Sequence, residues 1–166
     1  MNVPTFSDRT ARRAAAAAAV GFAGVAMFEI ALAAGVPWGE AAWGGQPAQL
    51  PTTLRLASGV VAVFYGAIMP LVVLGRAGYG GRDGSSRVFR WGTWFLAALM
   101  VLGALLNFAS QSRWENYLWG PYIVTLAILC IVVARRAART AGSADADHDR
   151  SKRRQTHEHQ SPGRSR

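Results

Sequence analysis

The residues best suited to chemistry in this chain are polar side chains that interrupt apolar runs. Glu29 is the only acidic residue deep within such a run. An ionisable group at bilayer depth costs about 2.5 to 3.5 kcal/mol on insertion scales, so it requires polar partners or a function. Other polar residues are expected in the same outer or middle part of the membrane. Together they predict an outward-facing polar cluster made of Glu29, Arg55, Ser58, Asn107, Tyr122 and Thr125.

Three interpretations of this cluster stay open. It is a hydrogen-bonded network that fixes the bundle, or a pocket that opens outward to a small molecule or lipid, or Glu29 faces lipid in its neutral form. Helix side chains lean toward the helix N-terminus, so Glu29 should lean inward and Arg55 outward to the head groups. We therefore expect Ser58, Asn107 or Tyr122, rather than Arg55, as the partner of Glu29.

No soluble catalytic pattern accompanies these residues. Histidine occurs only in the C-terminal tail, and there is no P-loop, zinc-ligand spacing or CxxC pair. The single cysteine, Cys130, lies in an apolar run and is interpreted as a packing residue. His157 and His159 flank Glu158, but a solvated tail explains them without a metal. The sequence thus predicts no catalytic residue, cofactor or metal site. An intramembrane enzyme that uses Glu, Arg and Tyr stays an alternative.

Four apolar segments must position the cluster. Apolar residues make up 51% of the chain and charged residues 16%, whereas a soluble domain carries about 25% charged residues. A helix needs about 20 apolar residues to cross a bilayer. Segments 14–35, 54–74, 91–109 and 117–134 meet this requirement. The predicted fold is all-α, a polytopic membrane protein with an up-down four-helix transmembrane bundle.

The basic residues set the expected orientation. Of the 18 lysines and arginines, only Arg55 and Arg113 lie in or beside the first and third loops. The other 16 precede the first segment, lie in the second loop or follow the fourth segment. Basic residues collect on the cytoplasmic side, so we expect a plasma membrane protein with both termini in the cytoplasm. The net charge of +9 flanks apolar runs, which argues for membrane lipids and against nucleic acid as partners.

The first segment also fits a rival interpretation, a cleaved signal peptide. It has a basic start, an apolar middle and a small-x-small site at Ala31-Leu32-Ala33. The position of Glu29 next to that site and the length of the apolar stretch favour a retained span.

Small residues predict which helix faces approach each other, because helices in lipid associate through close packing. We expect the first two helices to pack closely through two small-residue stripes, and Pro70 to bend the cytoplasmic end of the second helix. The stripes are Ala14, Ala17, Gly21 and Gly24 on the first helix, and Gly59, Ala62 and Gly66 on the second.

Composition divides the chain into three parts. These are a cytoplasmic N-terminal segment (1–13), the four-helix transmembrane domain (14–134) and a basic cytoplasmic tail (135–166). The tail lacks large apolar residues from about residue 141, which predicts disorder. Its arginines are suited to contact with anionic lipid head groups.

Three stretches resemble a known group. They are PWGEAAWGG (Pro37 to Gly45), LPTTLRLAS (Leu50 to Ser58) and LNFASQSRWENYLWGP (Leu106 to Pro121). They resemble segments of small, functionally uncharacterised four-helix integral membrane proteins of actinobacteria, over about residues 14–134. The resemblance implies a plasma membrane location and a four-helix bundle, and it carries no activity or functional residues.

These features predict a non-enzymatic membrane protein that binds a small apolar or amphiphilic ligand, or a membrane partner protein, from the outer side. One alternative is a small transporter or transport accessory subunit, and another is an intramembrane enzyme acting on lipid. The polar groups stop at middle depth, whereas a channel or proton pump needs them along its whole path.

Overall fold

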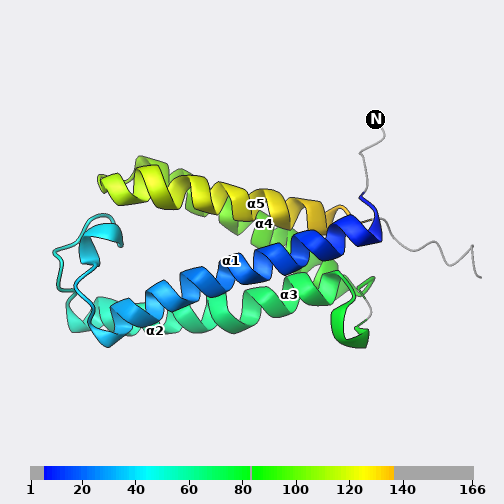
Figure 1. The fold of residues 1–166 in the computed structure, drawn as a ribbon, viewed down its shortest axis with the longest axis horizontal. Helices are drawn as coiled ribbons and strands as arrows, with labels where there is room; N and C mark the ends of the chain where they lie inside the picture. Colours follow the sequence, from blue (N-terminus) through cyan, green and yellow to red (C-terminus); the bar gives the residue numbers. More distant parts are fainter. Residues whose placement is uncertain (1–5, 83, 137–166) are drawn as a thin grey trace, which may run out of the picture.

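The computed structural model describes residues 6–82 and 84–136, which form four membrane-spanning helical segments of 27, 25, 23 and 20 residues. The predicted all-α transmembrane bundle is confirmed (Figure 1). The first span is α1 (Asp8–Ala34), and the third is α4 (Arg87–Ala109). The second joins α2 (Thr52–Val63), the π-turn η2 (Phe64–Ile68) and α3 (Met69–Arg76). The fourth joins the π-turn η4 (Glu115–Trp119) and α5 (Gly120–Ala134). Two 3-10 turns, η1 (Gly39–Ala41) and η3 (Tyr79–Gly81), lie in the first two loops.

The first helix begins earlier than the apolar pattern predicts. Ser7 caps it, because its hydroxyl accepts a hydrogen bond from the backbone N–H of Thr10 at 3.3 Å. Asp8 adds a negative charge to the first turn, where the helix dipole favours one. The helix ends at Gly35, whose φ of 95° suits the left-handed cap conformation. Residues 8–13, expected in the N-terminal segment, are therefore helical.

The core lies between the four spans, toward the end of the bundle that carries the chain termini. Its largest fully buried side chains include Phe22, Met69, Val73 and Met100. Cys130 is also fully buried in this core, consistent with a packing role. Apolar packing therefore fills this half of the described bundle.

Small residues bring α1 close to two neighbours. A Cβ added at Gly66 would lie 3.3 Å from Ala26, so the glycine stripe of the second span packs on α1 as predicted. The prediction that Gly21 and Gly24 of α1 also face the second span is wrong. A Cβ at Gly21 would lie 2.6 Å from Leu126, and one at Gly24 would lie 2.9 Å from the Tyr122 hydroxyl. These glycines therefore admit α5, because bulky α5 side chains require the space that they leave.

Each π-turn ends two residues before a proline. The N–H of Met69, before Pro70, bonds to the carbonyl of Phe64, and the N–H of Gly120, before Pro121, bonds to the carbonyl of Glu115. Proline lacks an N–H and its ring crowds the carbonyl four residues earlier. A widened turn accommodates both effects inside a span. The distortion expected at Pro70 thus takes the form of a wide turn on its N-terminal side.

Both described chain ends meet at one end of the bundle, here called the terminal end. The N–H of Phe6 donates to the carbonyl of Arg135 at 3.2 Å, and Arg136 pairs with Asp8 at 2.7 Å. The buried guanidinium of Arg76 donates to three backbone carbonyls: Gly84 (2.9 Å), Ala134 (3.3 Å) and Arg136 (2.9 Å). This arginine therefore joins α3, the second loop and the end of α5.

Replacing Arg76 with Met should lower the free energy of unfolding by about 3 kcal/mol or more, because hydrogen bonds to a charged group contribute about 1.5 to 3 kcal/mol each. Arg76→Lys should lower the free energy of unfolding by less than Arg76→Met does. The lysine keeps the positive charge, but one ammonium group cannot donate to all three carbonyls as the guanidinium does. The exposed Arg87 provides the matched control, and Arg87→Met should stay within about 0.5 kcal/mol. Unfolding in mild detergent, followed by circular dichroism, measures all three. Equal effects at positions 76 and 87 would contradict this role.

Candidate functional site

The two halves of the bundle diverge at the end opposite the termini. Figure 1 shows α1 and α2 separating there from α4 and α5, with the first loop (residues 35–51) lying at the open end. We call this the loop end. A cavity of about 210 Å³ lies at this end. We call it the acidic cavity; its lining is Val25, Phe28, Glu29, Ala41, Ala42, Trp43, Val61, Tyr65, Asn107, Glu115, Trp119 and Ile123.

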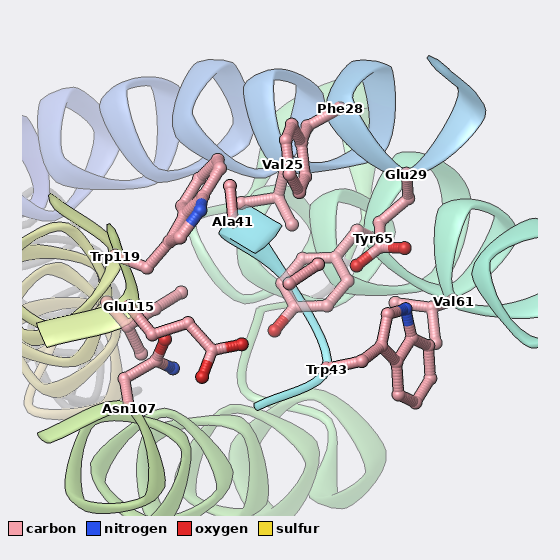
Figure 2. A pocket seen from close by; sticks show the side chains of 12 residues that line it. Val25, Phe28, Glu29, Ala41, Trp43, Val61, Tyr65, Asn107, Glu115 and Trp119 are labelled. Atoms are coloured by element: carbon pink, nitrogen blue, oxygen red, sulfur yellow. The ribbon is translucent and has the colours of Figure 1, made fainter. Parts of the chain in front are cut away.

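Glu29 supplies the first carboxyl group. Its side chain extends from α1 toward Tyr65 (Figure 2). The hydroxyl of Ser58, itself fully buried, lies beside the Glu29 carboxyl group. The Oε2 atom of Glu29 is buried and has no hydrogen-bond partner among the described residues. One carboxylate oxygen therefore keeps its capacity to accept a donor or bind a positive charge.

The same serine ties the first loop to the cavity. The indole Nε1 of Trp43 donates to the Ser58 hydroxyl at 3.1 Å. Trp43 has a φ of 55°, in the left-handed region that residues other than glycine rarely adopt. Gly44 and Gly45 continue with φ values of 80° and 82°. The loop thus holds an uncommon backbone conformation that directs the indole toward α2.

Glu115 supplies the second carboxyl group, from the π-turn of the fourth span. Only 9% of its surface is exposed, and its Oε1 accepts a hydrogen bond from the N–H of Gly44 at 2.9 Å. Ser112 braces the same region, because its hydroxyl donates to the carbonyl of Glu40 at 2.7 Å. The start of the fourth span and the loop before it are thereby attached to the first loop by two hydrogen bonds.

Aromatic side chains form much of the remaining wall. The rings of Phe28 and Trp119 lie 4.6 Å apart, and Trp119 makes an edge contact with Tyr122 at 5.7 Å. The indole Nε1 of Trp119 is buried without a hydrogen-bond partner among the described residues. Figure 2 shows the Glu29 and Glu115 side chains extending into the cavity from different helices, with the Tyr65 ring between them in this view.

The charges of the lining are unbalanced. It contains two carboxyl groups and no basic residue. Arg55 is the single basic residue of the predicted cluster. It donates from Nε and Nη2 to the carbonyl of Ala33, at 3.1 Å each, and does not line the cavity. That carbonyl belongs to the last turn of α1, where backbone acceptors lack helical partners and the dipole favours a positive charge. The arrangement therefore suits a positive group with apolar surface, because aromatic faces also attract cations.

The structure brings together only part of the predicted polar cluster. Glu29 lies beside Ser58, and Asn107 lines the same cavity while donating to the carbonyl of Gly103 at 2.8 Å. The other three residues donate hydrogen bonds to backbone carbonyls outside the acidic cavity. They are Arg55 at Ala33, Tyr122 at Gly21 (2.8 Å) and Thr125 at Pro121 (3.0 Å).

Sequence reasoning missed the second carboxyl group. The apolar pattern predicts that Glu115 lies in the outer loop, before a span that starts at about residue 117. The helical segment in fact begins at Glu115, and its face carries Glu115, Trp119 and Ile123 into the cavity at intervals of four. This helical spacing, continued upstream of Pro121, was the available signal. The histidines of the tail lie outside the described residues.

Comparison of the chain with protein-family models, curated proteins and solved structures found no match. The function is therefore argued from the site itself.

A double-mutant cycle tests whether Glu29 and Arg55 act as a pair. Glu29→Gln should lower the free energy of unfolding by at most about 1 kcal/mol, because the amide can still accept a hydrogen bond from Ser58 beside it. In the double variant with Arg55→Gln, the change in unfolding free energy should equal the sum of the two single changes to within about 0.5 kcal/mol, as for residues that share no contact.

Trp43→Phe and Ser58→Ala serve as the positive control, because their side chains are bonded directly. This second cycle should give a measurable coupling in the same detergent assay. A coupling above about 1 kcal/mol between positions 29 and 55, the range of residues in direct contact, would instead establish an ion pair.

Proposed function

We propose that this protein is a plasma membrane protein, with both termini in the cytoplasm, that binds a small organic cation from the outer side. The observation that carries the proposal is the acidic cavity, where Glu29 and Glu115 face aromatic walls and no basic residue lines the space. An uncompensated negative charge away from water is costly. A bound cation would remove that cost, which gives the ligand its affinity.

The size of the cavity supports a small ligand. A water molecule takes up about 30 Å³ of liquid volume, so 210 Å³ corresponds to about seven waters. A quaternary or tertiary ammonium with a few carbons matches this volume. Its methyl groups would contact Phe28, Trp43 and Trp119, and its charge would be shared between the two carboxylates.

The packing below the cavity supports a protein that binds a cation and not one that transports it across the membrane. Below the cavity, toward the terminal end, Phe22, Met69 and Met100 are at most 1% exposed. These three side chains offer a cation no polar groups with which to replace its hydration. The same packing supports a role in which the ligand enters and leaves on one side.

The charge distribution supports the proposed orientation. The described basic residues of the terminal end include Arg9, Arg12 and Arg13 on α1, and Arg135 and Arg136 after α5. The loop end carries Arg55 and Arg113 alone among the described residues. Retention of basic loops in the cytoplasm would place the acidic cavity on the outer side.

Charge removal at the cavity should abolish most cation binding. In lipid nanodiscs, tetramethylammonium should quench or shift tryptophan fluorescence, because Trp43 and Trp119 line the site. Glu29→Gln and Glu115→Gln should each weaken affinity at least about tenfold, equivalent to about 1.4 kcal/mol. Asp8→Asn is the matched control, since this carboxylate lies in the first turn of α1, at the terminal end, and does not line the acidic cavity. Failure of the wild type to bind, or equal affinity in all three variants, would refute the proposal.

Cysteine labelling tests the orientation. Gln49→Cys, in the first loop, should react with a membrane-impermeant maleimide in intact cells, whereas Ser86→Cys, just before α4, should react only after permeabilisation. The wild type provides the background, because Cys130 is fully buried. The reverse pattern would invert the topology.

A further inference from the structure

A second cavity adjoins the acidic cavity on the side between α1 and the fourth span. Its volume is about 420 Å³, and it shares Phe28, Ala41 and Trp119 with the acidic cavity. We call it the tryptophan cavity, since Trp38, Trp114 and Trp119 are part of its lining. Phe28, Ala41 and Trp119 thus form a wall that the two spaces share.

The tryptophan cavity is open toward the side of the bundle. Trp38 is 50% exposed, Trp114 57% and Leu118 49%. α1 packs against α5 where Gly21 and Gly24 leave room, and it diverges from the fourth span toward the loop end (Figure 1). Tryptophans with this exposure at the end of a span are typical of the head-group region. The opening therefore faces the boundary between head groups and acyl chains.

The lining combines apolar surface with acid and lacks bases. Besides the aromatic and leucine side chains, its polar side chains are Glu40 and the tryptophan indoles. With Glu29 and Glu115 beyond the ring pair, three carboxylates line the two adjoining cavities. A fatty acid or other anionic chain would be repelled, whereas a cationic head with a hydrocarbon chain complements both parts.

We infer that the ligand is a single-chain cationic amphiphile of the outer leaflet, with its head in the acidic cavity and its chain in the tryptophan cavity. This inference rests on the proposed cation-binding function and adds the ligand's chain to it. The neck of the molecule, at the junction between charge and hydrocarbon, would pass the shared wall, and the Phe28 and Trp119 rings, 4.6 Å apart, must separate to admit it. Such a ligand would enter laterally from the outer leaflet, since its chain already lies at the depth of the opening, between head groups and acyl chains.

A series of alkyltrimethylammonium ions tests the inference in nanodiscs, with methyl, butyl, hexyl and octyl chains. Affinity, referred to the free aqueous concentration, should rise roughly fourfold per methylene until the tryptophan cavity is filled. Octanoate, which carries a similar chain on a carboxylate, should not bind.

Leu118→Trp, which fills the chain site, should remove most of the gain with length and leave tetramethylammonium affinity within about twofold. The matched control is Leu105→Trp, at an exposed position that lines neither cavity, and it should keep the gain.

The outcomes separate the two proposals. If tetramethylammonium does not bind the wild type, the cation-binding function itself fails. If tetramethylammonium binds but longer chains add nothing, or Leu118→Trp and Leu105→Trp behave alike, the chain site is wrong and the cation site stands. Binding of octanoate comparable to that of the octyl cation would overturn the charge argument.

Discussion

The close packing of α1 on its neighbours, through glycines near the middle of the spans, sets the geometry of the cavity at the loop end. Gly21 and Gly24 let α5 approach α1, and Gly66 rests against Ala26. Because these glycines have no side chains, Leu126 and Tyr122 of α5 fill the space beside them and no cavity is left there. At the loop end the facing residues are Phe28 and Trp119 instead, and their size separates the same helices. A bundle that is tight at one end and wide at the other follows from this gradient in side-chain volume.

Hydrogen bonds from the first loop hold the wide end in shape. One reaches Ser58 from Trp43, another reaches Glu115 from the backbone of Gly44, and a third runs from Ser112 to the carbonyl of Glu40. Helix packing alone cannot fix spans that have separated. The loop therefore takes over the structural work that direct helix contacts perform near the termini, and its left-handed backbone at Trp43 is the conformation that this requires.

The fold could be predicted from the sequence because it depends on hydropathy along the chain, and the four spans needed no tertiary information. Part of the site followed as well, since a lone carboxyl in an apolar helix had to find polar neighbours, and Ser58 was among those expected. The partner of the α1 glycines could not be predicted, because a glycine stripe does not say which helix will use it. Glu115 could not be recognised from hydropathy alone. The fourth helix begins with the widened turn before Pro121, and this turn begins before the apolar run from which the span was predicted.

The bond between Gly44 and Glu115 links the state of the site to a single backbone amide. The N–H of Gly44 donates to a carboxylate that also lines the cavity. Its exchange with solvent deuterium is slow only while that carboxylate stays in place and the loop stays closed. Any occupant that draws Glu115 away must expose this amide, whereas one that clamps Glu115 must protect it further. The exchange rate of one glycine in the first loop thus reads out both the occupancy of the cavity and the position of the loop over it.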